Sequence, residues 1–256
     1  MDLVVGLREV WSGIVAILDD DPDWGAPTPC DGWDVHDVAA HLAHIESLVH
    51  GLEQPPTPTG FDPEAHQGFH GLTEEGVAAR RAMPHPAVVD EIRVASGLSL
   101  QAAEDRDEED WDEPAPSPIG MVPARHAVEM RLADAYVHLL DLRQALGIRI
   151  DPADEPTASR LTVARAVRLS GWGAVKQAGL SDGSRIRLEI EGAGGDLVVA
   201  GGRGGLEPFA PDTEDRIVGS GLAFLVAASG RAGKIDAGEL EVVGATAVRF
   251  LDGYRL

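Results

Sequence analysis

The fold of the first part of the chain is decided by the stretch Ala133-Asp134-Ala135-Tyr136-Val137-His138-Leu139-Leu140-Asp141, inside an apolar run from about residue 127 to 146. A helix turns by about 100° per residue, so Asp134, His138 and Asp141 share one stripe. Apolar residues flank this stripe on both sides, which predicts a buried helix over residues 124–146 whose acids and imidazole need partners. Two ligands four residues apart on one helical face are a common way to hold a divalent metal. The remaining question is whether the chain supplies a third ligand.

Length, charge and cysteine content limit the class of protein. The chain has 256 residues, enough for one large domain or two modest ones with a real core. A net charge of −22 argues against nucleic acid or an anionic membrane surface as a partner. The single cysteine, Cys30, rules out an intramolecular disulfide framework and fits a reducing compartment. With no signal peptide and no apolar run near the ~20 residues of a membrane span, we expect a cytoplasmic protein, either a monomer or a small homo-oligomer.

Apolar spacing predicts four further helices in the first part of the chain. They cover about residues 3–19, 35–51, 73–83 and 86–105, and together with the helix over 124–146 they predict a helical bundle of about 150 residues. Residues 54–60 are rich in proline and predict a connection. Residues 104–118 are acidic and proline-rich around Trp111, so we expect an exposed loop there, either free or folded over the end of the bundle.

The predicted helix over residues 35–51 offers the third ligand. Asp34 is placed to cap its N-terminus, and His41 falls inside its apolar sector, whereas His36 points away from that sector and His44 lies at its edge. All nine histidines lie between His36 and His138. Any imidazole chemistry therefore belongs to the first part of the chain.

The second part of the chain has a mixed pattern. Residues 151–156 form the best boundary by composition, and a helix is predicted over 157–177. Strict alternation predicts a strand over 185–190, followed by a glycine turn at 192–195 and a return strand over 196–200. Short strands at 217–219 and 240–243, an apolar helix through 229 and a closing helix complete a small α+β domain over residues 157–256.

His41, Asp134 and His138 form the main candidate site. In the functional interpretation, two imidazoles and one carboxylate hold zinc or another divalent metal and leave one position open for water or substrate. Asp141 is then either an extra ligand or an acceptor that orients His138 by a hydrogen bond. In the structural interpretation, Asp134 and His138 form a satisfied buried pair and His41 is a core histidine. Spacing alone leaves both interpretations open.

Other motifs carry less information. Cys30 precedes a predicted helix start, which suits a nucleophile, but a small packed residue in a tight loop is the alternative we favour. Arg131 and Arg143 lie on the central helix and either bind a substrate carboxylate or pair with local acids. The glycine-rich runs at 192–195 and 201–205 are predicted hairpin turns. The remaining histidines considered are predicted to be solvent-facing or in loops: His44, His50, His66, His70 and His85.

Two signatures resemble those of one family. The stretch Pro27-Thr28-Pro29-Cys30-Asp31-Gly32-Trp33-Asp34-Val35-His36-Asp37-Val38-Ala39-Ala40-His41-Leu42 resembles the opening signature of the mycothiol-dependent maleylpyruvate isomerase family, which belongs to the DinB-like helical bundles of actinobacteria. Residues 134–141, continuing to Gly147, resemble its second signature. Residues 217–220, 229–231 and 240–244 resemble its sterol-carrier-like C-terminal domain. The resemblance implies two domains: a DinB-like metal-binding four-helix bundle over 1–150 and a small α+β domain over 157–256.

The resemblance also implies a site and an activity. Family members hold zinc through a histidine, a glutamate and a second histidine, which correspond here to His41, Asp134 and His138, so Asp134 departs from the usual glutamate. The implied activity is a zinc- and mycothiol-dependent isomerase or S-transferase, acting on a small electrophilic substrate with a low-molecular-weight thiol. Arg131 and Arg143 would then be donors to developing charge. The alternatives are a catalytically silent binding or regulatory module, which Asp134 favours, and a metal-assisted hydrolase.

Overall fold

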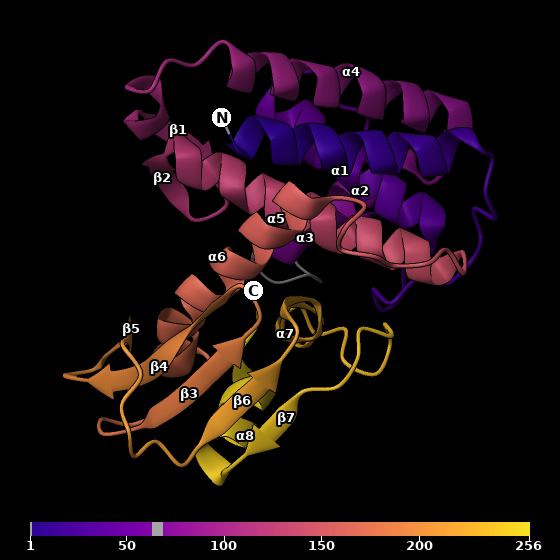
Figure 1. Ribbon diagram of the computed structural model, residues 1–256. Helices are drawn as coiled ribbons and strands as arrows, with labels where there is room; N and C mark the ends of the chain where they lie inside the picture. Colours follow the sequence, from indigo (N-terminus) through magenta and orange to yellow (C-terminus); the bar gives the residue numbers. More distant parts are fainter. Residues whose placement is uncertain (1, 63–68) are drawn as a thin grey trace. The chain divides into compact units, whose positions relative to one another are not determined.

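Two compact units make up the computed structural model, Met1–Ile150 and Asp151–Leu256 (Figure 1). The structure describes residues 2–62 and 69–256, without the side chains at positions 69 and 70. His66 and the side chain of His70 therefore lie outside the described residues, and their predicted exposure stays a prediction. No helix in the described ranges is long and apolar enough to cross a membrane.

The first unit is mainly helical. Its helices are α1 (Asp2–Asp19), α2 (Val35–Val49), α3 (Phe69–Arg80), α4 (His85–Glu104) and α5 (Ala124–Ala145), each within a few residues of its predicted range (Figure 1). Helix α1 contacts α4 and α5, and α2 contacts the same two helices, so four long helices enclose one core. Helix α3 packs against α2. Fully buried side chains fill the core, among them Leu7, Ile14, Leu42, Ile92, Leu132 and Leu139.

Local sequence sets the ends of the two helices that matter most for the site. Helix α2 begins where the Asp34 side chain accepts a hydrogen bond from the backbone N–H of Asp37, at 2.9 Å. Helix α5 ends before Gly147, whose φ of 65° lies in the left-handed region that glycine adopts without steric cost. These caps fix which residues of each helix face the core.

The segment over residues 104–118 is largely exposed, as its composition predicts, but it is not all loop. It contains a short 3-10 helix, η2 (Asp110–Asp112), and leads into an antiparallel hairpin of β1 (Pro114–Ser117) and β2 (Gly120–Pro123). Both elements contact α5, and Trp111 is only 7% exposed. One large apolar side chain is therefore enough to anchor an otherwise polar and exposed segment against α5.

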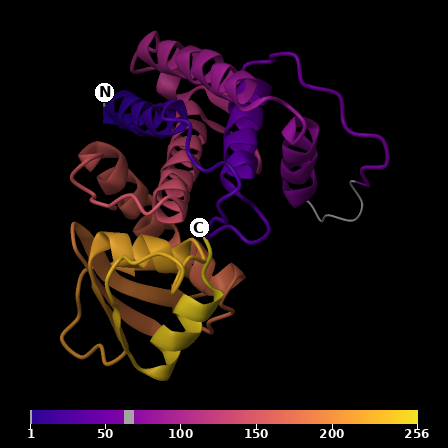
Figure 2. The same ribbon diagram turned by 90° about the vertical axis from the view of Figure 1, so that its right-hand side faces the viewer.

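The second unit is a five-stranded sheet with helices. The sheet order is β5-β4-β3-β6-β7, and all neighbours are antiparallel except β3 and β6. Helices α7 and α8 lie over one face of the sheet (Figure 2), and α6 packs against β4 and β5. The elements are α6 (Pro156–Lys176), β3 (Arg185–Ile190), β4 (Ala193–Ala200), β5 (Arg203–Glu207), β6 (Arg216–Gly219), α7 (Gly221–Ala228), β7 (Glu241–Val243) and α8 (Ala245–Gly253).

Glycine has a different role here from the predicted one. The run at 201–205 is only partly a turn: Gly201 and Gly202 have positive φ values, whereas Gly204 lies within strand β5. A Cβ at Gly204 would lie 2.0 Å from the carbonyl oxygen of Gly171 in α6. Strand β4 likewise begins at Ala193, inside the run predicted as a turn. These glycines permit close backbone approach, which sequence alone does not distinguish from a turn.

Asp196 organises the loop that follows β5. Its fully buried carboxylate accepts hydrogen bonds from Thr213 Oγ1 at 2.7 Å, Ala210 N at 2.9 Å and Arg185 Nη1 at 3.0 Å. Burial alone would raise the pKa of Asp196, but these hydrogen bonds outweigh burial and hold the pKa below its usual value. The acid thus serves the stability of the second unit.

Candidate metal centre

Three side chains from two helices converge in the first unit. His41 comes from α2, whereas Asp134 and His138 come from α5, and one ligand atom of each lies within 4.8 Å of the others. His41 Nε2 is 3.1 Å from Asp134 Oδ2, and His138 Nε2 is 3.7 Å from Asp134 Oδ1. Ligands of a tetrahedral zinc ion are separated by roughly 3.3 Å, given bond lengths of about 2.0 Å. The three residues therefore fit a divalent ion with small adjustments.

The three ligands differ in exposure. His41 is 3% exposed and His138 is 5% exposed, whereas the side chain of Asp134 is 43% exposed. The imidazoles thus lie in the protein interior, and the carboxylate lies at the solvent side. The two imidazoles are therefore shielded from solvent, whereas solvent can reach the negatively charged Asp134 carboxylate.

Asp141 orients one of the imidazoles. His138 Nδ1 donates a hydrogen bond to Asp141 Oδ2 at 3.0 Å, and the Asp141 side chain is fully buried. A neutral imidazole that donates through Nδ1 keeps its lone pair on Nε2, the atom that faces Asp134. This hydrogen bond corresponds to one of the two roles that the sequence predicted for Asp141, the other being an extra ligand.

The loop before α2 carries a residue that sequence reasoning missed. Its backbone is a tight turn in which Thr28 N donates to Trp33 O and Trp33 N donates to Cys30 O, both at 3.0 Å, with Gly32 at a φ of 81°. The turn places the Trp33 ring beside two ligands, with ring centroids 5.2 Å from His41 and 6.0 Å from His138. The available signal was the position of Trp33, immediately before the capped start of the helix that bears His41.

His36 and His44 are buried, contrary to their predicted positions on α2. His36 Nε2 donates to the carbonyl of Arg80 at 3.0 Å, and His44 Nδ1 donates to Gln54 Oε1 at 3.0 Å. The helical wheel predicted exposure because it could not show that α3 covers this side of α2. Burial lowers the pKa of His44, opposed by the Gln54 hydrogen bond.

His50 and His85 are half-buried rather than solvent-facing. His50 Nε2 donates to Ser99 Oγ at 2.7 Å, and burial, followed by the nearby positive charge of Arg131, lowers the pKa of His50. The His85 ring stacks on Trp24 with centroids 4.4 Å apart. Both imidazoles therefore have packing roles away from the three candidate ligands.

The two arginines of α5 lie in different surroundings. Arg131 forms a two-pronged ion pair with buried Glu46, with Nε to Oε1 at 2.9 Å and Nη2 to Oε2 at 2.7 Å. Arg131 Nη2 also donates to Ser99 Oγ at 2.6 Å. These contacts correspond to the alternative in which Arg131 pairs with a local acid. Arg143 is buried in the last turn of α5, and the side chain of Cys30 is half-buried.

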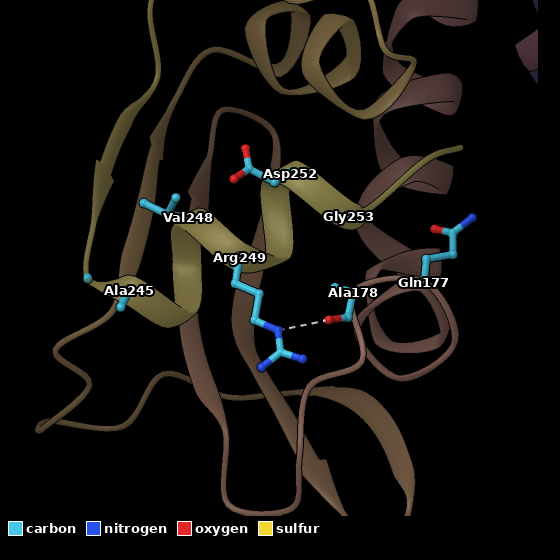
Figure 3. A pocket seen from close by; sticks show the side chains of 8 residues that line it. Gln177, Ala178, Ala245, Val248, Arg249, Asp252 and Gly253 are labelled. Atoms are coloured by element: carbon cyan, nitrogen blue, oxygen red, sulfur yellow. Dashed lines mark hydrogen bonds between the residues drawn. The ribbon is translucent and has the colours of Figure 1, made fainter.

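The second unit contains a surface hollow of different character (Figure 3). It has a volume of about 750 Å³ and contains no imidazole. Arg249 Nε donates to the carbonyl of Ala178 at 3.1 Å, and Nη2 donates to that of Gly179 at 2.9 Å, which ties α8 to the end of α6. The hollow is lined by Gln177, Ala178, Gly244, Ala245, Val248, Arg249, Asp252 and Gly253.

These features define a class of protein with a helical unit that carries a His–Asp–His group, followed by an α+β unit. Within that class, residues 6–143 match the family described as the mycothiol maleylpyruvate isomerase N-terminal domain, and the chain belongs to this family. The match covers the helices that carry all three candidate ligands. It confirms the family that the two signatures indicated.

Two further comparisons concern relatives and solved structures. The chain is 31% identical over 148 residues to uncharacterized proteins from two strains of Mycobacterium tuberculosis, a match that covers 56% of this chain and 65% of each relative. Two crystal structures of the mycothiol-dependent maleylpyruvate isomerase, one of a histidine-to-alanine mutant, match with a TM-score of 0.61. These matches cover 94% of this chain and 95% of the other at 20% identity, so they establish a similar overall fold.

Proposed function

We propose that this protein binds a divalent metal, zinc above all, through His41, Asp134 and His138, and that it uses the metal with mycothiol in an isomerase or S-transferase reaction. The substrate would be a small electrophile, as in the isomerase whose fold it shares. The observation that carries the proposal is the convergence of three ligand atoms within 4.8 Å. Family membership and the signatures around these residues support the choice of thiol.

The finer fold assignment is part of the same proposal. We interpret the helices α1, α2, α4 and α5, in which α1 and α2 each contact both α4 and α5, as a DinB-like four-helix bundle over residues 1–150. The α+β unit would be a sterol-carrier-like domain over residues 157–256. Support comes from the order of strands and helices and from the motif resemblance at residues 217–220 and 240–244.

The residues of the chain prepare the site for a metal in three ways. Asp141 holds His138 with its Nε2 lone pair toward the site. The buried positions of His41 and His138 exclude bulk water from one side, whereas Asp134 keeps the other side accessible. When bound, a zinc ion supplies a Lewis acid that keeps a thiol in its reactive thiolate form. The carboxylate of Asp134 offsets part of the charge of the cation.

Elemental analysis of full-length protein purified without chelators tests the metal assignment. We expect about one divalent ion per chain in the wild type and loss of the ion in His41→Ala, because an open site keeps only three protein ligands. His85→Ala is the matched control, since it removes a half-buried imidazole from the same unit while leaving the three ligands intact. A wild-type protein without a stoichiometric ion would overturn the proposal.

Turnover assays separate the proposed reaction from its alternatives. We expect consumption of a small electrophile such as maleylpyruvate only when mycothiol is present, and loss of that activity in His41→Ala. Metal binding without any turnover would instead support a binding or regulatory module. Hydrolytic turnover without thiol would support the metal-assisted hydrolase.

A further inference from the structure

We propose that Trp33 and Glu74 form a positioning pair that holds the imidazole rings of His41 and His138 in the orientation that binds metal. Helix α3, which carries Glu74, then controls metal affinity without supplying a ligand. This inference rests on the proposed metal site and adds residues that act through its ligands. The supporting contacts involve the indole faces, the indole N–H and the docking of α3.

Three aromatic rings contact one another at the centre. The Trp33 ring is tilted by 42° to the His41 ring, with centroids 5.2 Å apart, and lies at 29° to the His138 ring, with centroids 6.0 Å apart. The two imidazoles meet edge to face, with centroids 4.8 Å apart. Trp33 is itself 9% exposed, so the indole forms a buried wall beside both ligands.

This wall matters because an imidazole ring rotates readily about its outer torsion. That torsion joins a tetrahedral carbon to a planar ring, so its energy wells are broad and roughly two-fold. A metal requires the Nε2 lone pair of each ring to point at one place. Asp141 restrains His138 through Nδ1, and the indole face restrains the planes of both His138 and His41.

Glu74 fixes the indole in turn. Trp33 Nε1 donates to Glu74 Oε1 at 2.8 Å, across the gap between the loop before α2 and helix α3. Arg81 strengthens the same connection, since its Nε lies 2.9 Å from Asp37 Oδ1 and its Nη2 lies 3.8 Å from Glu74 Oε2. The indole is therefore held by its edge as well as by its faces.

Helix α3 is firmly docked on the neighbouring helices. Arg80, at the end of α3, is fully buried and pairs with Glu91 of α4. The same guanidinium donates to Gln54 Oε1 at 3.0 Å and to the carbonyl of Gly76 at 3.0 Å. A docked α3 presents Glu74 at a fixed place, and any displacement of α3 would release the indole.

Cobalt binding to the full-length protein tests the pair. Co²⁺ gives a visible absorption band that reports ligand geometry, and we compare wild type with Trp33→Ala, Trp33→Phe, Glu74→Ala and Glu74→Gln. We expect Trp33→Ala and Glu74→Ala to weaken Co²⁺ binding by about 10–100-fold, the usual effect of losing a group that orients a ligand. Glu74→Gln should stay near wild type, because its amide oxygen still accepts from the indole.

Tryptophan fluorescence supplies an independent readout. Bound Co²⁺ should quench emission from Trp33, so the metal-dependent quenching should largely disappear in Trp33→Phe while the visible band persists. A role limited to packing would lower the unfolding midpoint without changing the Co²⁺ affinity or spectrum of the folded protein. Glu74→Ala keeps the indole in place and therefore tests the pair even if Trp33→Ala folds poorly.

The chain offers a matched control. Trp24 Nε1 donates to Asp21 Oδ1 at 3.0 Å, and its ring stacks on His85 and contacts His36, so the same chemistry occurs around histidines that are not ligands. Trp24→Ala and Asp21→Ala should leave Co²⁺ affinity unchanged. The inference is wrong if wild type binds Co²⁺ but Trp33→Ala and Glu74→Ala bind it equally well, or if Trp24→Ala is as damaging. Failure of wild type to bind any divalent ion would instead refute the metal site itself.

Discussion

The carboxylate of Asp134 bridges the two imidazoles of the centre. One oxygen lies 3.1 Å from His41 Nε2 and the other lies 3.7 Å from His138 Nε2. Aspartate is one methylene shorter than the glutamate usual in the family that the signatures resemble. Because α2 and α5 contact each other directly, the shorter side chain still reaches both rings. Helical spacing could predict that Asp134 and His138 share a face of α5. Only the structure shows that Asp134 also reaches His41 on α2.

Removal of the Asp134 charge tests its part in metal binding. We expect Asp134→Asn to weaken zinc binding by more than the roughly 10–100-fold typical of groups that only orient a ligand, because an anionic ligand is lost. Isothermal titration with zinc measures the change. Asp90→Asn, at an exposed acid on α4, is the control and should bind zinc as wild type does. Equal affinity in wild type and Asp134→Asn would remove Asp134 from the ligand set.

The pKa of His44 predicts a loss of stability in mild acid. Burial lowers this pKa below 6.5, so the unfolded chain binds more protons than the folded chain as the pH falls from 6.5 toward the folded pKa. The free energy of unfolding should therefore decrease over that interval. His50 contributes with the same sign.

Urea unfolding of wild type and His44→Gln at about pH 7.5 and pH 5.5 measures this effect. The variant should lose less stability than wild type between the two conditions, because one imidazole with a lowered pKa is gone. An identical loss in both proteins contradicts the assignment to His44.

At the scale of elements, α3 shows what the sequence could not predict. Its existence was predicted from apolar spacing over 73–83, close to the observed Phe69–Arg80. Its docking was not predicted, because the contact depends on Gly76 lying directly against the His44 ring. The same contact explains why His44 is buried. How one helix packs on another depends on the surfaces of both helices, and a helical wheel describes only one of them.

A pair of glycine substitutions tests this docking. A Cβ at Gly76 would lie 2.1 Å from His44 Cγ, so Gly76→Ala should force α3 or His44 to move and destabilise the protein by about 1–3 kcal/mol. Gly97→Ala on α4 is the control, because a Cβ there meets no heavy atom within 4 Å among the described residues. That control should be neutral or stabilise by up to about 1 kcal/mol. Urea unfolding measures both, and equal effects would contradict the close contact.

The strands show a second limit of sequence patterns. Strand β3 was predicted at its observed bounds because Ile186, Leu188 and Ile190 alternate with charged residues. Strand β5 was missed because its glycines, of which Gly204 lies against the backbone of Gly171 in α6, resemble a turn. Alternation indicates a half-buried strand, whereas backbone contact between a helix and a strand leaves no periodic signal.

At the scale of the whole molecule, the candidate ligands are confined to one unit. His41, Asp134 and His138 lie within Met1–Ile150, as the distribution of histidines in the sequence indicated. The family match over residues 6–143 covers the same part of the chain. Zinc should therefore stabilise the first unit directly, by linking α2 to α5.

Hydrogen exchange read by mass spectrometry tests where zinc acts. At a zinc concentration about 100 times Kd, binding adds about 2.7 kcal/mol to the stability of the species that binds. We expect the gain in amide protection to concentrate in peptides from α2 and α5, with little change in peptides from β3 and β4. Equal gains in both units, or none in α2, would contradict this placement.

The unequal exposure of the three candidate ligands has a kinetic consequence for the proposed metal site. His41 and His138 are nearly inaccessible, so an incoming ion would meet the half-exposed carboxylate of Asp134 first and reach the imidazoles afterwards. Release would follow the reverse order, and a chelator would approach from the Asp134 side. The rate at which a bound ion exchanges with the surrounding solution would therefore depend on how quickly the ion leaves the two buried imidazoles and passes to Asp134.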